Sequence, residues 1–405
     1  MNFLRRRKNS SEDEDDDEFL NVTAAKNTRT KSRKPPNTAF RQQRLKAWQP
    51  ILTPKLVIPL LLLVAIIFAP LGTVITQTQY NVEIIQIDYS KCESLANTED
   101  YRSVPKSKVY YHFKGKSTDP NVKWKLINST SHRGDEGLRC LLQFDLPKDI
   151  KPPLYLYYRL TNFYQNHRKY VQSVDLPQLK GEAVSPESLT TNCKPLRSIT
   201  DDQGNEKAIY PCGLIANSMF NDTFENPVLL NPKLSDNNET YTFSQSDISW
   251  SSDKTKYKKT TYNVDDIVPP PNWAKQFPNG YTTDNLPDLN NWEHFQNWMR
   301  TAGLPNFYKL YGKNTTSTLS SGTYLMNINL NYPVSVFGGT KSVVITTSSI
   351  FGGRNVSLGI IFIIVAVVSL VMLIGFFLQH LIRPRRVGDH NFLQGSAFTA
   401  VRDQL

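Results

Sequence analysis

The stretch LVIPLLLLVAIIFAPLGTVI, at Leu56–Ile75, contains no charged side chain. As a helix with a rise of about 1.5 Å per residue it would span about 30 Å, the thickness of the hydrocarbon core of a bilayer. A second such stretch is LGIIFIIVAVVSLVMLIGFFL, at Leu358–Leu378. A cleaved signal peptide is a poor alternative for the first stretch, because a long basic region precedes it and its apolar run is too long. We predict a membrane protein with two transmembrane helices, at 56–76 and 357–379.

Basic residues flank the two stretches on their outer sides. Because cytoplasmic flanks of membrane helices are enriched in Lys and Arg, we expect both tails, 1–55 and 380–405, in the cytoplasm. The segment 77–356 is then a large exoplasmic ectodomain of a protein in the secretory pathway, at the endoplasmic reticulum, Golgi, endosome or plasma membrane. The flanking residues are Arg41, Arg44, Lys46 and Lys55 before the first stretch and Arg383, Arg385 and Arg386 after the second.

The net charge of +11 reflects this topology rather than a nucleic-acid partner. The N-terminal tail carries +6 and the C-terminal tail +2, which leaves only +3 for the ectodomain. No basic stripe with interleaved aromatic residues is present, and we therefore expect no binding to nucleic acid.

The N-terminal tail contains two distinct segments. The acidic block SSEDEDDDE, at Ser10–Glu18, lies between basic runs, a pattern typical of a disordered arm. Nearer the membrane, the segment AFRQQRLKAWQPILTP, at Ala39–Pro54, mixes cations such as Arg44 with Phe40 and Trp48. Such a mixture is typical of an interfacial anchor or a docking strip.

All four cysteines fall in the predicted ectodomain. An even number confined to an exoplasmic domain predicts two disulfides. Three connectivities are possible, and we favour the sequential one, in which Cys92 pairs with Cys140 and Cys193 with Cys212. A zinc site is the competing interpretation, but the sequence has no C-x-x-C spacing, and we expect no metal.

Acceptor sequences for N-glycosylation also concentrate in this region. A match at Asn355 lies next to the second stretch, and matches at Asn9 and Asn21 lie in the predicted cytoplasmic tail, and we expect these three to stay unmodified. The acceptors that we predict to carry glycans are Asn128, Asn221, Asn238 and Asn314.

The ectodomain pattern is mostly that of β-strands. In GTYLMNINLNYPV, at Gly322–Val334, large apolar residues alternate with asparagines, which predicts a half-buried antiparallel strand. Further strands are predicted at 82–89, 123–127, 138–144, 154–160 and 342–347.

One helix is predicted, within NNWEHFQNWMRTAG at 290–303. Asn290 and Glu293 form a plausible capping pair at its start, and Gly303 with the following Pro305 ends it. Its aromatic face is more typical of a core than of a ligand site, and it comprises Trp292, Phe295, Trp298 and Met299.

The sequence shows no catalytic arrangement. The six histidines are scattered without an H-E-x-x-H pair, and neither G-x-S-x-G nor G-x-x-x-x-G-K-[ST] occurs. Asp253-Lys254-Thr255 matches the start of the aspartyl-phosphate motif of P-type ATPases, but Lys256 stands where that motif has glycine. We expect neither an enzyme nor a cofactor.

Several longer motifs resemble the cell division control protein fifty family, the non-catalytic subunits of type IV P-type ATPases, which flip phospholipids. The resemblance runs from about Ala39 to the end of the second stretch, and the fungal branch is most similar because the ectodomain has only four cysteines. The motifs are NHRKYV (166–171), YPCGLIANSMFNDTF (210–224), SSDKTKYKKT (251–260), PPPNW (269–273), NWEHFQNWMR (291–300) and GGRN (352–355).

The resemblance implies a one-to-one complex with a catalytic ATPase and contact with membrane lipids. In such a complex the accessory chain covers the exoplasmic loops of the ATPase, and the ATPase depends on it for folding, endoplasmic-reticulum exit and phospholipid transport to the cytoplasmic leaflet. The resemblance also implies an antiparallel β-sandwich with helical insertions, stabilised by disulfides. The residues expected at the partner interface are Phe40, Arg44, Trp48, Asn217, Ser218 and Arg354.

Two other functions remain possible from the sequence. The first is a free-standing cell-surface receptor or adhesion protein with two membrane anchors, which would be stable without any ATPase. The second is a lumenal glycan-processing enzyme, which would need a constellation of carboxylates or histidines that the motif search does not find.

Overall fold

The structure is a computed structural model that describes residues 37–45, 52–115, 118–130, 136–201, 204–230 and 238–384. Its contacts define two compact units, Met1–Thr53 and Pro54–Leu405. The described part of the first unit includes a turn in which Gln42 N donates to Thr38 O at 2.9 Å and Arg44 N donates to Ala39 O at 2.7 Å. Trp48 and the acidic block at 10–18 lie outside the described residues.

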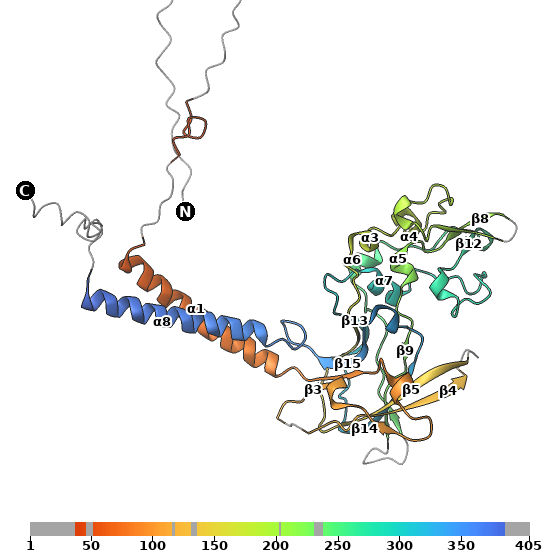
Figure 1. The fold of residues 1–405 in the computed structure, drawn as a ribbon, viewed down its shortest axis with the longest axis horizontal. Coiled ribbons are helices and arrows are strands. Elements are labelled where there is room, and N and C mark those ends of the chain that lie inside the picture. Colours follow the sequence, from red (N-terminus) through yellow and green to blue (C-terminus); the bar gives the residue numbers. More distant parts are fainter. Residues whose placement is uncertain are drawn as a thin grey trace, which may run out of the picture. The chain divides into compact units, whose positions relative to one another are not determined.

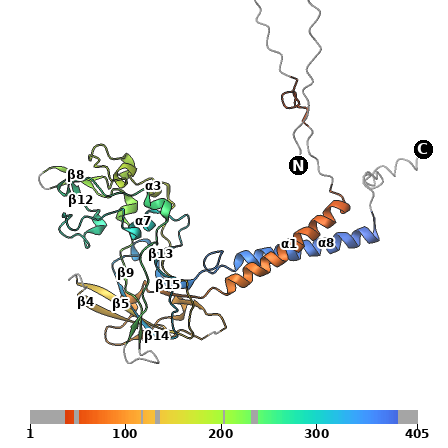
Figure 2. The same cartoon turned by 180° about the vertical axis from the view of Figure 1, so that it is seen from behind.

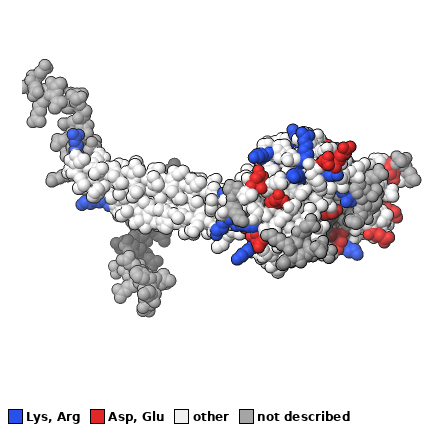
Figure 3. Space-filling model, turned by 90° about the horizontal axis from the view of Figure 1, so that it is seen from below, with Lys and Arg blue, Asp and Glu red and all other residues white. Residues whose placement is uncertain are grey.

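Two long apolar helices lie near the ends of the second unit. Helix α1 (Pro54–Tyr80) and helix α8 (Ser357–Ile382) are both long and apolar enough to cross a membrane. They lie side by side in both ribbon views (Figures 1 and 2). The face of the pair that Figure 3 shows carries charge only near its ends, as expected for a surface that contacts lipid.

The two helices approach closely at a pair of glycines. A Cβ atom on Gly359 would lie 2.3 Å from Thr76 Oγ1 and 2.8 Å from Thr76 N. A Cβ atom on Gly72 would lie 2.9 Å from Ile363 Cγ1 and 3.0 Å from the carbonyl oxygen of Gly359. Small residues allow two membrane helices to bring their backbones together, and α1 and α8 use glycine on both sides of the contact for this purpose.

A β-rich domain connects the helices, and its first sheet has five antiparallel strands in the order β13-β6-β15-β1-β3. The chain enters this sheet directly after α1 and leaves it shortly before α8, so the sheet is the part of the domain nearest to both helices along the chain. The strands are β13 (Phe307–Asn314), β6 (Leu154–Leu160), β15 (Lys341–Thr347), β1 (Ile84–Asp88) and β3 (Val109–His112).

The second sheet follows the order β11-β10-β14-β5-β4-β2, and β9 also pairs with β14. All of these pairs are antiparallel. The strands are β11 (Glu239–Thr240), β10 (Val228–Leu230), β14 (Gly322–Asn329), β5 (Glu136–Leu146), β4 (Lys123–Thr130), β2 (Arg102–Ser103) and β9 (Thr223–Phe224).

The two sheets share one hydrophobic core. Burial alternates along β6, where Leu154, Leu156 and Tyr158 point inward, and along β14, where Met326 and Ile328 do. Residues of both strands belong to the same cluster of buried side chains. The predicted antiparallel, sandwich-like architecture is therefore confirmed.

Strand β14 ends at Asn329, and its predicted extension to Val334 is wrong. The N–H groups of Asn331 and Tyr332 donate to Oδ1 of Asp222, at 2.6 Å and 2.7 Å, rather than to a neighbouring strand. Pro333 follows and has no N–H group to donate. The side chain of Asp222 thus takes the place of a strand at this edge.

Short helices and a small third sheet form the insertions between the strands. The third sheet contains β12 (Ile267–Val268), β8 (Glu206–Ile209) and β7 (Ser198–Thr200), and its β12–β8 pair is parallel, unlike the pairs above. The α-helices are α2 (Cys92–Leu95), α3 (Arg168–Val171), α4 (Leu176–Leu179), α5 (Leu214–Asn217), α6 (Ser251–Lys254) and α7 (Glu293–Met299). The 3-10 helices are η1 (Lys106–Lys108), η2 (Thr191–Cys193), η3 (Val264–Asp266), η4 (Pro271–Trp273) and η5 (Ser335–Phe337).

Two disulfides link these elements in the sequential pairing. The Cys92–Cys140 bridge joins α2 to β5, with the Cα atoms 6.1 Å apart. The Cys193–Cys212 bridge joins η2 to the segment before α5, with the Cα atoms 5.8 Å apart. All four cysteines are buried and paired, which leaves no thiol for a metal. The protein is a two-span membrane protein with a large, disulfide-stabilised β-rich domain.

Helix α7 forms where a helix is predicted, but the predicted capping pair of Asn290 and Glu293 is wrong. The N-cap residue is Trp292, and no side chain caps the helix there. The carboxylate of Glu293 instead accepts from the N–H groups at 247–249, at 3.1, 2.7 and 3.0 Å, and from Lys254 Nζ at 2.9 Å. Burial by itself would raise the pKa of Glu293, but these donors lower it to about 2.

Replacement of Glu293 by glutamine is expected to lower the free energy of unfolding by up to about 3 kcal/mol at pH 7, since each pKa unit corresponds to about 1.4 kcal/mol. The carboxylate has a folded pKa of about 2 against an ordinary value of 4.5. The stability that the charged carboxylate contributes is therefore fully present above pH 4.5 and is lost as the pH falls toward 2. Thermal unfolding of the full chain in lipid nanodiscs, at pH 7 and pH 3, measures the difference between Glu293→Gln and the native chain.

The exposed carboxylate of Asp284 gives a matched control, and Asp284→Asn should leave the melting temperature unchanged at both pH values. If Glu293→Gln were less stable than the native chain by the same amount at pH 7 and at pH 3, the loss of stability could not be assigned to the charge of Glu293.

Candidate interaction surfaces

Motifs that are far apart in the sequence meet around the short helix α5. Trp298 Nε1 donates to Ile215 O at 2.8 Å, and Trp273 Nε1 donates to Ala216 O at 3.0 Å. The hydroxyl of Tyr170 is 2.8 Å from Ser218 Oγ. We call this group of α3, α5, α6, η4 and α7 the motif lobe. The aromatic face of α7 is therefore core, as predicted, and its indole groups bind the carbonyl oxygens of α5.

The chain enters α5 through a glycine that no other residue can replace without strain. Gly213 has a φ of 96°, and a Cβ atom there would lie 2.1 Å from the carbonyl oxygen of Ser173. The adjacent Cys212 N donates to Gln178 Oε1 at 2.8 Å, and Leu214 N donates to Ser173 Oγ at 2.9 Å. The Cys193–Cys212 bridge thus holds the start of α5 in a tightly packed position.

Asn217 and Ser218 both make hydrogen bonds inside the motif lobe. Oδ1 of Asn217 accepts from Asn272 N at 2.9 Å, and Oγ of Ser218 donates to Leu214 O at 2.8 Å. The carbonyl oxygen of Ser218 also accepts from the hydroxyl of Tyr332 at 3.1 Å. Both residues are half-buried, and their contact with a partner remains a prediction.

Several residues that flank the helices of the motif lobe along the chain are exposed, and the predicted interface residues do not include them. Trp250 is 63% exposed, and the guanidinium carbon of Arg300 lies 4.4 Å from the centre of its ring. Leu304 and Tyr164 are also exposed, at 70% and 56%. Trp, Tyr and Arg are the residue types enriched where proteins bind one another. No periodicity marks these residues in the sequence, since their exposure depends on the tertiary fold.

The aspartate of the Asp253-Lys254-Thr255 stretch has a structural role. It is buried and forms ion pairs with Lys256 at 2.6 Å and with Arg300 at 3.3 Å. Lys254 in turn pairs with Glu293 at 2.9 Å. Lys256 and Arg300 thus neutralise the buried carboxylate of Asp253. The ion pair holds Arg300 beside the ring of Trp250, which is a structural role rather than that of a nucleophile.

The junction between the membrane helices and the β-rich domain is held by polar contacts. Gln79, near the end of α1, is 2% exposed; its Nε2 donates to Ser349 Oγ at 3.0 Å, and its Oε1 accepts from Asn355 N at 2.9 Å. Arg354 Nη1 donates to the hydroxyl of Tyr110 on β3 at 2.5 Å. Arg354 thus lies at the junction. Gln79 near the end of α1 makes hydrogen bonds with the loop at 349–355, and this loop leads directly into the start of α8.

Two of the interface residues predicted in the N-terminal tail lie among the described residues of the first unit. Phe40 is 76% exposed, and Arg44 is also exposed and donates to Asn37 Oδ1.

The predicted glycan acceptors lie at four separate places in the β-rich domain. Asn128 on β4 and Asn238 are exposed, whereas Asn221 and Asn314 are half-buried. Nδ2 of Asn314 donates to Thr242 O at 2.8 Å.

A buried ion pair lies directly beside one of these acceptors. Asp222 is 2% exposed; its Oδ2 accepts from Lys341 Nζ at 2.7 Å and from the hydroxyl of Tyr89 at 2.9 Å. Lys341 Nζ also donates to Tyr332 O at 2.7 Å. Burial raises the pKa of Tyr89 well above its ordinary value and Asp222 raises it further, so Tyr89 acts as a donor. This network joins the residue after β1, strand β15 and the segment after β14, and thereby connects both sheets.

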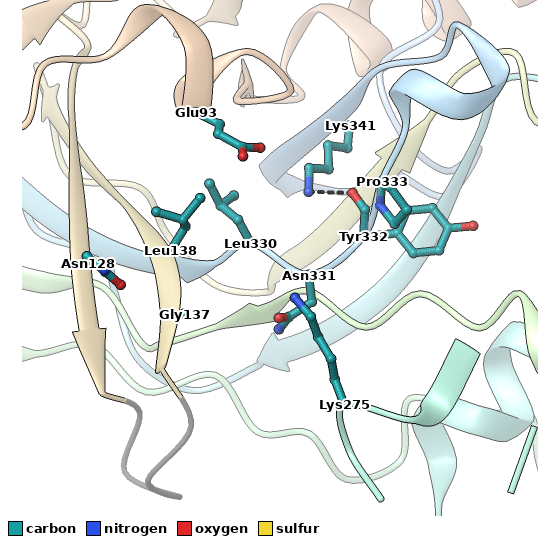
Figure 4. Close-up of a pocket in the computed structure, with 10 residues that line it drawn as sticks. All are labelled: Glu93, Asn128, Gly137, Leu138, Lys275, Leu330, Asn331, Tyr332, Pro333 and Lys341. Atoms are coloured by element: carbon teal, nitrogen blue, oxygen red, sulfur yellow. Dashed lines mark hydrogen bonds between the residues drawn. The ribbon is translucent and has the colours of Figure 1, made fainter. Parts of the chain in front are cut away.

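A pocket of about 460 Å³ opens beside this ion pair. In Figure 4, Asn128 and Leu138 lie on one side of it, Glu93 and Lys341 on another, and Lys275 on a third. The lining contains a single carboxylate, which is not the paired arrangement that glycan hydrolysis requires. Among the described residues, no group of three or more His, Cys, Asp or Glu side chains is placed to hold a metal.

Comparison with known proteins identifies the family. A model described as the LEM3 (ligand-effect modulator 3) family / CDC50 family matches residues 75–386. The chain is 49% identical over 372 residues to the phospholipid-transporting ATPase accessory subunit CRF1 of Saccharomyces cerevisiae, and the alignment covers 91% of each protein. It is 42% identical to the accessory subunit CDC50 of Chaetomium thermophilum, over 89% of this chain and 90% of that protein.

The similarity extends to animal proteins. The chain is 36% identical to the cell cycle control protein 50A of Mus musculus, over 84% of this chain and 88% of that protein. The matched region runs from the end of α1 through α8 and includes every motif that gave the resemblance, which is thereby confirmed. The chain belongs to the LEM3/CDC50 family.

Proposed function

We propose that this chain is the non-catalytic accessory subunit of a phospholipid-transporting type IV P-type ATPase. The observation that carries the proposal is the similarity to accessory subunits of phospholipid-transporting ATPases, which extends over about nine tenths of the chain. The family match at residues 75–386 includes the β-rich domain and α8, so both take part in this function. It supplies binding, and the catalytic subunit supplies the phosphoryl-transfer chemistry and the lipid path.

The geometry suits such a partnership in two places. The outer surface of the α1–α8 pair is apolar and exposed, and it can pack beside the membrane helices of a larger protein. Beside the helices of the motif lobe, Trp250 and Arg300 stack on each other, and Leu304 and Tyr164 are also exposed. A rigid surface loses little conformational entropy on binding, which favours a stable one-to-one complex.

The residues proposed at the interface lie on both sides of the membrane. Phe40, Arg44 and Trp48 would contact the cytoplasmic side of the ATPase, and Arg354 would contact lipid headgroups or a carboxylate at the junction. Asn217 and Ser218 make hydrogen bonds within the motif lobe. They would affect the interface by maintaining the shape of the motif lobe. The ATPase would depend on the accessory chain for folding, exit from the endoplasmic reticulum and transport of phospholipid to the cytoplasmic leaflet.

The same proposal includes an orientation. The β-rich domain is exoplasmic and both tails, 1–55 and 380–405, are cytoplasmic, at the Golgi, endosome or plasma membrane after exit from the endoplasmic reticulum. The positive flanks of both helices support this orientation. The glycans lie on Asn128, Asn221, Asn238 and Asn314, of which the exposed Asn128 and Asn238 are the most accessible.

Co-purification tests the function and the orientation together. An epitope-tagged chain, extracted in mild detergent, is expected to bring down a type IV P-type ATPase in equal amount. Peptide N-glycosidase is expected to lower the apparent mass of the purified chain by up to four glycans. A free-standing receptor would instead be recovered alone and would reach the cell surface in cells that lack every such ATPase.

A further inference from the structure

We propose that the turn Ser349–Gly352 inserts Ile350 and Phe351 into the lipid leaflet on the side of the β-rich domain. This turn would be a third attachment of the chain to the membrane, in addition to α1 and α8. It would fix the height and tilt of the β-rich domain above the bilayer. The inference depends on the two membrane spans and is independent of the identity of the partner.

The turn has a well-defined backbone. Ser349 N donates to Gly352 O and Gly352 N donates to Ser349 O, both at 2.9 Å. Oγ of Ser349 accepts from Phe351 N at 3.2 Å and donates to Gly352 O at 3.0 Å. Gly352 has a φ of 94°, which a residue with a side chain rarely adopts. The two central residues are therefore held at the tip of a closed turn.

The tip of the turn is apolar and exposed. Ile350 is 96% exposed and Phe351 is 49% exposed. Turns favour Gly, Asn, Asp, Ser and Pro, because these residues suit the backbone or bind it locally. Ile and Phe bring neither property, and Ile350 contributes almost nothing to the core of the protein. Their side chains fit a function outside the fold.

The contacts of Gln79 place the turn at the depth of the lipid headgroups. Nε2 of Gln79 donates to Ser349 Oγ at 3.0 Å, and Gln79 lies four residues beyond Ile75, the last residue of the apolar stretch. Four residues of helix correspond to about 6 Å. The headgroup region extends about 5–8 Å beyond the hydrocarbon core on each side. Side chains at the tip of the turn can therefore reach the acyl chains.

The residues around the turn are those found at membrane interfaces. Tyr80 at the end of α1 is 53% exposed, and Tyr110 on β3 is 46% exposed. Arg354 donates to the hydroxyl of Tyr110 at 2.5 Å, which places a guanidinium group at this level. Aromatic rings and cations of this kind gather where membrane proteins meet the headgroups. The apolar surface of α8 begins at Leu358, a few residues further along the chain, so the turn continues the lipid-facing surface.

A fluorophore at position 350 tests the inference directly. All four native cysteines are in disulfides, so Ile350→Cys supplies a single site for an environment-sensitive dye. The full chain is placed in nanodiscs whose lipids carry bromine at shallow, middle or deep acyl positions. We expect strong quenching, greatest for the shallow position, in the chain alone and in its complex with a partner.

Val336→Cys gives the matched control. Val336 is 82% exposed and lies before the start of β15 at Lys341. The seven residues of β15 extend about 20 Å from Lys341 to Thr347, which is the end of the strand nearer to the membrane helices along the chain. The dye at position 336 should show no quenching by any brominated lipid. A dye at position 350 that is quenched no more than the one at 336 would overturn the inference.

Two further measurements separate lipid from protein as the occupant. Quenching at position 350 that disappears when a partner binds would mean that the turn docks on that partner, and would also overturn the inference. Replacing Phe351 by serine, in the Ile350→Cys chain, should reduce the quenching at least twofold. The same substitution at the exposed Leu304 should have no effect, and neither should change the melting temperature.

Discussion

Replacement of Asp222 by asparagine is expected to lower the free energy of unfolding of the β-rich domain by about 3–5 kcal/mol, the usual loss when one member of a buried ion pair is removed. The carboxylate accepts from Lys341 Nζ, the hydroxyl of Tyr89 and the N–H groups of Asn331 and Tyr332. An asparagine side chain has one acceptor oxygen and leaves the Lys341 ammonium buried without a counter-charge. The melting temperature of the full chain in nanodiscs and the fraction retained in the endoplasmic reticulum measure the loss.

The position of Asp222 allows a clean separation from glycosylation. Asp222→Asn keeps the acceptor sequence of Asn221 and Thr223 intact, so a change in stability cannot arise from a lost glycan. Asn221→Gln removes the acceptor and leaves the carboxylate network in place, and it should have a much smaller effect.

A double variant completes this test. Asp222→Asn combined with Lys341→Met removes both charges and should be more stable than Asp222→Asn alone. Equal melting temperatures for Asp222→Asn and the native chain would contradict the role of the ion pair. A double variant that loses as much stability as the two single variants together would contradict it as well.

Replacement of Gly359 by valine is expected to reduce recovery of the ATPase complex more than tenfold. A Cβ atom at this position would meet Thr76 Oγ1 at 2.3 Å and the Thr76 backbone N at 2.8 Å, so the helices must separate. Separation changes the shape of the lipid-facing surface that the partner contacts. The β-rich domain should keep its melting temperature, since its core does not include Gly359. Co-purification and thermal unfolding measure the two effects independently.

Gly375 on the same helix is the control. Apart from its own stretch of helix, a Cβ atom there meets no atom of the described residues within 4 Å, and Gly375→Val should leave the α1–α8 contact intact. Equal recovery of the complex with valine at positions 359 and 375 would show that the close contact has no role in assembly.

The local features of the fold were predictable from the sequence. The two apolar stretches appear as α1 and α8, and the strand predicted at 154–160 is β6, with the same bounds of Leu154–Leu160. Each of these features depends on residues close together in the chain. Strand β13, one of several strands that the local pattern does not predict, shows why such patterns fail elsewhere.

Strand β13 places a lysine on its inward face, between Phe307 and Tyr311. Lys309 is 6% exposed, and its Nζ donates to the carbonyl oxygens of Asn297 at 2.8 Å and Arg300 at the end of α7. A charged side chain at an inward position breaks the apolar alternation. Only the distant carbonyl groups of α7 make that position favourable for a lysine.

The candidate surfaces were predictable only in part, for the same reason. Asp222 appears in the sequence as the middle residue of a glycan acceptor, and its partners Tyr89 and Lys341 lie more than a hundred residues away. Glu293 suits a helix cap by local rules, yet the loop at 247–249 offers it three N–H groups. Trp250 is exposed only because the fold turns it outward against Arg300.

The molar ratio of partner to chain tests the central proposal most directly. The tagged full chain is purified in mild detergent from cells that express it at its native level, and both proteins are quantified by mass spectrometry. We expect one type IV P-type ATPase per chain, a ratio that stays constant through size-exclusion chromatography. Recovery of the chain without any such ATPase, from cells in which it still reaches its normal membrane, would contradict it.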